Sequence, residues 1–100
     1  MAKRRMPAAT SWARSVWAVA YPGEPWPKGW TVQWVGFMRG TLGLTIYSER
    51  RVCLSYGDRK RQNPIATLIH EFIHVRHGVR LRHGRDFRRL ETAALLRVWY

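Results

Sequence analysis

The sequence predicts one α+β domain built from an N-terminal helix, a three-stranded antiparallel sheet and two further helices. Apolar residues recur at helical spacing near the N-terminus and in the last third of the chain, whereas residues 31–56 are rich in β-branched and aromatic side chains. The 100 residues match the length of one domain, and a hydrophobic content of 46 % is sufficient for one packed core. We therefore expect residues 1–100 to form a single domain.

The N-terminal part is expected to consist of a basic tail, residues 1–9, and a helix that ends near Ala20. Thr10 or Ser11 can act as the N-cap of this helix. The apolar residues expected on its inner face are Trp12, Val16 and Val19. The tail and the helix superficially resemble a signal peptide, but Arg14 interrupts the apolar stretch, so the sequence favours a cytoplasmic protein.

The middle of the chain is expected to form a loop and then a sheet. Residues 21–30 contain three prolines and two glycines, which favours a loop. The segments with the composition of strands are residues 31–37, 44–47 and 51–56. Short turns separate them, which indicates an antiparallel meander. Residues 57–62 are polar and would connect the sheet to the next helix.

A helix is predicted over residues 63–78. Asn63 is suited to the N-cap, Pro64 to the first helical position and Gly78 to the end of the helix. The apolar stripe of this helix consists of Ile65, Leu68, Ile69, Phe72 and Ile73. A last helix is expected after residue 84, and its buried stripe consists of Phe87, Leu90, Ala94 and Val98.

The predicted helix 63–78 carries a pattern of metal-binding residues, His70-Glu71-Phe72-Ile73-His74. Positions four residues apart share one face of a helix, so His70 and His74 can each bring a ring nitrogen to roughly 2.0–2.1 Å from one zinc ion. Glu71 can reach a zinc-bound water without binding the metal, which is the position of a general base. The alternative is a polar helix face that carries these side chains without a metal.

A catalytic zinc site needs a third protein ligand, and three residues after the motif are candidates. His77 lies on the same helix but is turned away by roughly 60° relative to His74. Glu91 lies on the last predicted helix. His83 lies beyond the turn at Gly78, where it can fold back toward the metal.

The spacing of these residues resembles that of the SprT-like and WLM metallopeptidases and of the short YgjP-type metallopeptidases. The matching positions are His70, Glu71, His74, His83, Gly84 and Phe87. The resemblance covers residues 42–99 and implies a minimal zincin-like fold, with His83 as the third zinc ligand and Phe87 packed beneath the site. Glu91 remains the reserve ligand. The eight-residue gap between His74 and His83 is shorter than in SprT proteins and longer than in YgjP-type ones.

The motif and the resemblance together predict a zinc-dependent metallopeptidase that uses one Zn²⁺ ion. The metal would lower the pKa of its bound water toward ~7 and polarise the scissile carbonyl, and Glu71 would take the proton of the water and pass it to the leaving amine. Asp86 can act either as an acceptor for a ligand histidine or as a favourable charge at a helix N-terminus. The candidate donors to the oxyanion are Tyr56, Tyr100 and His77. An extended peptide substrate is expected to add to an exposed sheet edge.

The formal net charge of +12 indicates attraction to nucleic acid or to another anionic partner. Arginine supplies 15 of the 18 cationic residues, which codon usage in a GC-rich genome would also produce. The resemblance to SprT-like proteins implies substrates that are associated with nucleic acid. The second hypothesis is a basic module that binds nucleic acid or protein and holds a structural or vestigial metal site. Cys53 is the single cysteine, which excludes a Cys-rich metal site, and no apolar run is long enough for a transmembrane helix.

Overall fold

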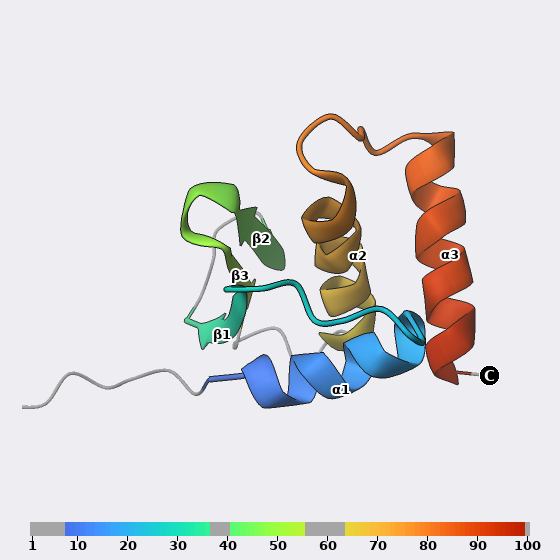
Figure 1. Cartoon of the computed structure of the whole chain (residues 1–100). Helices are drawn as coiled ribbons and strands as arrows, with labels where there is room; N and C mark the ends of the chain where they lie inside the picture. Colours follow the sequence, from blue (N-terminus) through green and yellow to red (C-terminus); the bar gives the residue numbers. More distant parts are fainter. Residues whose placement is uncertain (1–7, 37–40, 56–63, 100) are drawn as a thin grey trace, which may run out of the picture.

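The helices and strands follow the predicted order along the chain. A computed structural model describes residues 8–36, 41–55 and 64–99. The elements are α1 (Thr10–Ala20), β1 (Thr31–Val35), β2 (Gly43–Ile46), the 3₁₀-helix η1 (Tyr47–Glu49), β3 (Arg51–Ser55), α2 (Pro64–His77) and α3 (Arg85–Trp99). In Figure 1 the sheet lies on one side of α2 and α3 lies on the other, while α1 runs along one end of all of them. The predicted α+β fold class is confirmed.

The sheet is mixed, so the predicted antiparallel meander is wrong in its topology. The strand order is β1-β3-β2, with β1 parallel to β3 and β2 antiparallel to β3. Four of the five residues of β3 are buried, and the central position gives this strand a hydrogen-bonding neighbour on each side. β2 and η1 lie between β1 and β3 in the chain, and this separation leaves room for the crossover that parallel pairing of β1 and β3 requires. The less buried β2 is therefore left at one edge of the sheet.

The face that α1 turns to the core matches the predicted one in part, since Val16 is buried as predicted. Its buried residues are Ala13, Val16, Trp17 and Ala20. Val19, which was expected inside, is 49 % exposed, and Trp12 is half-buried and stacks on Trp34. The buried face combines two alanines with Trp17, whose ring packs against Phe72 of α2.

The start of α1 is fastened to the sheet instead of being capped by a side chain. Ala9 occupies the N-cap position and makes no side-chain cap, so the predicted caps at Thr10 and Ser11 are wrong. The Thr10 hydroxyl instead accepts a hydrogen bond from the Val32 N–H at 3.0 Å and lies 3.2 Å from the Val32 carbonyl oxygen. Thr10 therefore covers part of the outer edge of β1.

An aromatic cluster packs against the face of α2 that points away from the histidines. Phe72 is 1 % exposed, and its ring centroid lies 5.0 Å from that of Trp17, 5.9 Å from that of Trp26 and 6.3 Å from that of Tyr21. The predicted apolar stripe of α2 is buried at Leu68, Ile69, Phe72 and Ile73, and Ile65 is half-buried. With this face in the core, the histidines of α2 face the opposite side, toward the outside of the core.

The predicted loop 21–30 packs against α2. It contains no helix or strand, and the Arg76 guanidinium donates from Nε and Nη2 to the Glu24 carboxylate at 3.1 and 2.6 Å. The Trp17 indole N–H donates to the Glu24 carbonyl oxygen at 3.2 Å. These bonds join the loop to the C-terminal end of α2 and to α1.

Some predictions fall on residues outside the described ranges. They concern most of the basic tail, the end of the first predicted strand, the polar connection at 57–62, the Asn63 cap, Tyr56 and Tyr100. None of the helices within the described ranges is long and apolar enough to cross a lipid bilayer.

Tyr21 is a buried polar group that the core tolerates without a hydrogen bond. Within the described residues its hydroxyl has no hydrogen-bond partner, and the Arg76 guanidinium lies over the ring, 4.3 Å from its centroid. Burial raises the pKa of Tyr21 to about 12, although Arg76 and Arg97 act in the opposite direction.

We expect Tyr21→Phe to raise the free energy of unfolding by about 1 kcal/mol at neutral pH, because it removes a buried hydroxyl without a partner. The folded protein keeps the Tyr21 proton up to a pKa of about 12, whereas the unfolded chain loses it near pH ~10. Wild-type stability should therefore fall relative to the variant as the pH rises through this window. Urea unfolding of both proteins across the same pH range measures the difference, and a constant difference above pH ~10 would contradict it.

Candidate metal centre

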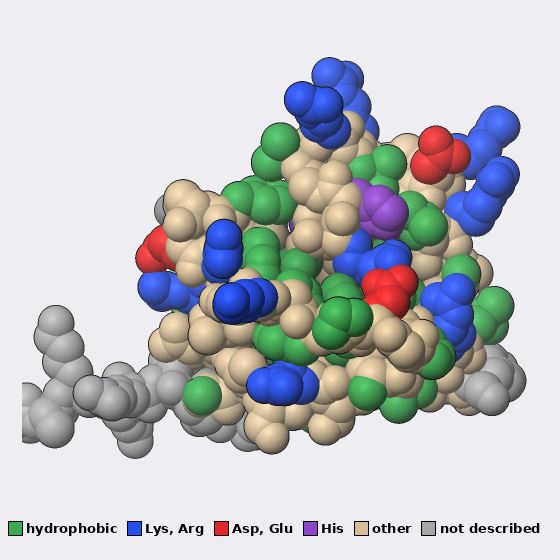
Figure 2. Space-filling view, viewed as in Figure 1, with side chains coloured by type: hydrophobic (Ala, Val, Ile, Leu, Met, Phe, Trp, Pro, Cys, Tyr) green, Lys and Arg blue, Asp and Glu red, His purple; other side chains and the backbone are tan. Residues whose placement is uncertain are grey.

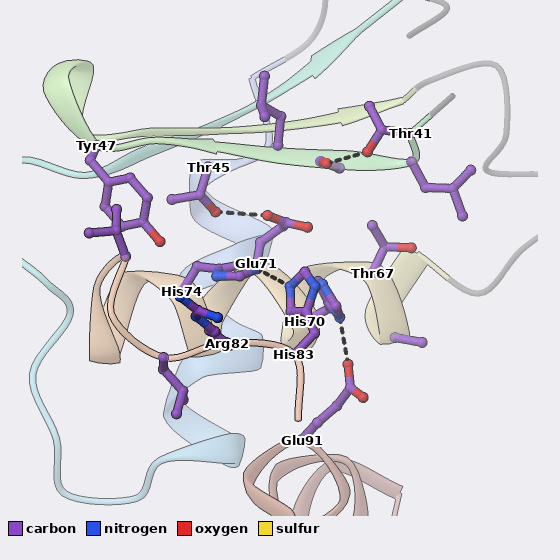
Figure 3. A pocket seen from close by; sticks show the side chains of 16 residues that line it. Thr41, Thr45, Tyr47, Thr67, His70, Glu71, His74, Arg82, His83 and Glu91 are labelled. Carbon is purple, nitrogen blue, oxygen red and sulfur yellow. Dashed lines mark hydrogen bonds and ion pairs between the residues drawn. The ribbon is translucent and has the colours of Figure 1, made fainter. Parts of the chain in front are cut away.

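Three histidine side chains converge beside α2. The ring nitrogens of His70, His74 and His83 lie within 4.8 Å of one another, and Nε2 of His83 lies 2.8 Å from Nε2 of His74. Figure 3 shows the three imidazoles in one space between α2 and the loop that leads to α3. The two motif histidines and the favoured third ligand are therefore close enough to hold one metal ion.

The helical spacing of the motif and the turn after it bring the three rings together. His70 and His74 lie four residues apart on α2 and share one face. Gly78 has a left-handed conformation with a φ of +74°, and its N–H donates to the His74 carbonyl oxygen at 2.8 Å. This residue ends α2 and reverses the chain, so that His83 returns to the ring of His74.

Phe87 forms a floor beneath the three imidazoles. Its side chain is 2 % exposed. The centroid of its ring lies 4.7 Å from the centroids of His70 and His83 and 5.1 Å from that of His74. Contact with all three rings restricts their rotation. The structure thus places Phe87 beneath the site, as the resemblance implied.

Glu91 contacts the back of His70 and does not join the three nitrogens. Its Oε2 lies 2.8 Å from Nδ1 of His70. When Nδ1–H donates to this carboxylate, the lone pair of Nε2 is left for a metal. Glu91, the alternative third ligand, therefore lies where it can orient the His70 ring. Asp86 is exposed in the first turn of α3, and within the described residues it makes no hydrogen bond to a histidine.

Glu71 is buried between α2 and β2. It is 5 % exposed, and the Thr45 hydroxyl donates to its Oε1 at 2.8 Å. A Cβ atom at Gly43 would lie 2.9 Å from Oε2 of Glu71 and 2.9 Å from Cγ2 of Thr67. Glycine at this position therefore allows β2 to come close enough for Thr45 to hold the carboxylate.

Burial shifts the pKa values of two motif residues, Glu71 and His74. It raises the pKa of Glu71, and the hydrogen bond from Thr45 and the charge of His70 partly offset this effect. It lowers the pKa of His74, which His70 and His83 lower further. A neutral His74 is the form that binds a metal, and a carboxylate with a raised pKa is a stronger base than an exposed one.

These groups line one open pocket of about 920 Å³ beside the edge strand β2. The sequence left open whether the strand at 44–47 or the one at 51–56 borders the site, and the central position of β3 identifies β2 as the edge strand. Two exposed apolar side chains in the pocket wall are Leu44, at 47 % exposure, and Val79, at 74 %. The pocket thus combines an open strand edge, apolar walls and the three histidines.

Several pocket residues were not predicted, and several predicted ones are elsewhere. Thr45 and Tyr47 both line the pocket, and their spacing of two residues, which places strand side chains on one face, was the available signal. His77 is exposed at the end of α2 and does not line the pocket. Tyr56 and Tyr100, the other predicted oxyanion donors, lie outside the described residues.

The donor set fits a zinc ion. Three neutral imidazole nitrogens and one open position form a common ligand set of catalytic zinc. The nitrogens of such a tetrahedral site lie ~3.3 Å apart, and those of His70, His74 and His83 already lie within 4.8 Å of one another. Small rotations of the side chains are therefore sufficient to bring all three to one ion.

No protein-family model matches this chain, and neither a curated protein nor a solved structure is significantly similar to it. The functional argument therefore depends on the geometry of the pocket.

We expect Gly43→Ala to lower the free energy of unfolding by about 1–3 kcal/mol, because the added methyl group forces Glu71 and Thr67 away from β2. Gly36→Ala is the matched control, since a Cβ there would have no atom within 4 Å. It should change the stability by less than about 1 kcal/mol. Urea unfolding of the three proteins measures both effects, and equal changes in the two variants would show that the contact at Gly43 is not tight.

Proposed function

We propose that this protein is a zinc-dependent peptidase similar to the SprT-like type, with His70, His74 and His83 as metal ligands and Glu71 as the general base. One observation supports this most strongly: a buried carboxylate held by a hydrogen bond lies in the same pocket as three convergent imidazoles. A purely structural zinc site is closed by four ligands and has no use for such a carboxylate.

The residues around the metal would each have a separate task. Bound zinc would polarise the scissile carbonyl and acidify a water molecule. Glu71 would accept a proton from that water and pass it to the leaving amine. The Thr45 hydroxyl would hold the carboxylate in place through Oε1 while the carboxylate accepts the proton. Glu91 would hold the His70 ring in the orientation and tautomer that bind the metal.

An extended peptide would bind along the open edge of β2. Within the described residues β2 pairs with β3 on one side, and its other side borders the pocket. Main-chain hydrogen bonds to such an edge are a recurrent way of binding peptides. Leu44 and Val79 would contact apolar side chains of the substrate.

The substrates would be proteins associated with nucleic acid, in the cytoplasm. All five arginines of the segment 80–89 are exposed; they are Arg80, Arg82, Arg85, Arg88 and Arg89. Figure 2 shows Lys and Arg side chains over the α2–α3 loop and along α3, close to a histidine at the surface. A substrate bound to a polyanion would be drawn to this face.

The same basic face favours a second candidate function, a nucleic-acid- or protein-binding module with a structural or vestigial metal site. The net charge of +12 supports it. It gives no role to the buried Glu71 or to the hydrogen bond from Thr45, and we therefore place it second.

We expect the protein to contain about one zinc ion per chain when it is purified without added zinc. His83→Ala should lose most of this metal, because two imidazoles hold zinc far more weakly than three. His77→Ala, which removes an exposed histidine outside the pocket, is the matched control and should retain it. Glu71→Gln should also retain zinc but lose hydrolysis of a casein-type substrate by at least ~10²-fold. Metal analysis and a proteolysis assay measure the two properties.

Two outcomes would change this assignment. A wild-type protein without bound metal would exclude the proposed function. Metal that survives His83→Ala but not Glu91→Ala would make Glu91 the third ligand and leave the chemistry intact.

The second candidate function predicts binding to duplex DNA that weakens steeply with salt. If six phosphate contacts form, affinity should fall about 10³-fold between roughly 50 and 200 mM salt. Fluorescence anisotropy with a labelled duplex measures this, and a nearly salt-independent affinity would contradict an electrostatic interface. Full DNA binding in a protein without zinc and without proteolysis would favour the binding module over the peptidase.

A further inference from the structure

The side chain of Tyr47 faces the candidate metal centre from the sheet. Tyr47 is the first residue of η1 and directly follows β2. It is half-buried and lines the same pocket as Glu71 and His74. Figure 3 shows its ring extending from the end of the strand toward α2, with the hydroxyl turned to the side of His74. Among the described residues, this hydroxyl has no hydrogen-bond partner.

The position of Tyr47 at the end of β2 and a contact with Trp30 orient its side chain. Tyr47 directly follows β2, two residues after Thr45, and both residues line the pocket beside α2. The edge of Trp30 packs against it, with ring centroids 6.3 Å apart and an interplanar angle of 89°. Trp30 is itself held through its carbonyl oxygen, which accepts a hydrogen bond from the Trp26 indole at 3.1 Å. The Tyr47 ring is thus held in place by Trp30, and its hydroxyl needs little movement to donate a hydrogen bond.

The environment keeps this hydroxyl protonated. Burial raises the pKa of Tyr47, and the negative charge of Glu71 raises it further. The phenol is therefore available as a hydrogen-bond donor at neutral pH.

Arg82 is the other pocket side chain with a strong donor. It is exposed on the loop before α3, where water competes for its guanidinium. Donors contribute most to catalysis when they are fixed in advance and shielded from water. These criteria favour Tyr47.

We propose that the Tyr47 hydroxyl stabilises the oxyanion of the tetrahedral adduct, an inference that rests on the proposed peptidase function. As the water oxygen bonds to the carbonyl carbon, the π electron pair moves to the carbonyl oxygen and a proton moves to Glu71. The Tyr47 O–H donates a hydrogen bond to the oxygen that gains the charge. When the C–N bond breaks, the carbonyl re-forms, the proton passes from Glu71 to the amine nitrogen, and Tyr47 keeps its own proton.

The test compares Tyr47→Phe with the wild-type protein, both loaded with zinc. We expect kcat to fall about 10²-fold or more, since one oxyanion donor is lost, with KM and zinc content unchanged. A second measurement does not depend on turnover: the affinity for a phosphinic peptide, whose tetrahedral anion mimics the adduct, should fall at least tenfold. The affinity for the cleaved product peptide should not change.

Tyr21→Phe is the matched control, because it removes a tyrosine hydroxyl from the core behind α2, and it should leave kcat and both affinities unchanged. Wild-type kcat and phosphinic-peptide affinity in Tyr47→Phe would overturn the inference while the peptidase function stands. A loss in Arg82→Gln in place of Tyr47→Phe would transfer the role to Arg82. A wild-type protein that neither cleaves peptides nor binds the phosphinic peptide would overturn the proposed function, and the role of Tyr47 with it.

Discussion

The close approach of β2 to α2 at Gly43 is the constraint on which the pocket depends. It buries the Glu71 carboxylate, and burial of a charged group is tolerable only when a hydrogen bond compensates for lost water. Thr45 supplies that bond at 2.8 Å, and it can do so only because no side chain at position 43 separates strand from helix. The opposing face of α2 carries Phe72, whose packing among aromatic rings holds the helix against the rest of the core. Apolar packing on one face of α2 thus holds the helix in place for the hydrogen bond between Thr45 and Glu71 on another face.

The histidines and the glutamate of the pocket are held by residues from two other elements of the fold, β2 and α3. His70 is held by Glu91 of α3, Glu71 by Thr45 of β2, and the three imidazoles together by Phe87 at the start of α3. The geometry of the candidate site therefore depends on how the sheet, α2 and α3 are placed relative to one another. A change in any of these elements would alter the site without touching a ligand.

The parts of the site that depend on local spacing were predictable from the sequence. Helical periodicity places His70 and His74 on one face of α2, and Gly78 ends that helix where a left-handed residue is needed. The order of the strands was not predictable in the same way, because it depends on which strand is buried on both sides, a property of the assembled core. β3 takes the centre for this reason, although it is the last strand in the chain.

Long-range contacts set the remaining features. The inner face of α1 includes Trp17, which packs on Phe72 of α2, and Val19 lies outside. The hydrogen bonds of Glu91 with His70 and of Thr45 with Glu71 join residues 21 and 26 positions apart. Nothing in the local sequence distinguishes these partners from other polar side chains of the same helices and strands.

The open edge of β2 has a consequence for the behaviour of the protein in concentrated solution. An unpaired strand edge is a template for any extended chain, including a second copy of the same protein. A net charge of +12 on a chain of this size repels such copies at low and moderate ionic strength. The same field attracts acidic segments, so it favours chains of opposite charge over a second copy at this edge. Among the described strands β2 pairs only with β3, and charge repulsion between copies is one of the ways in which such an edge is protected.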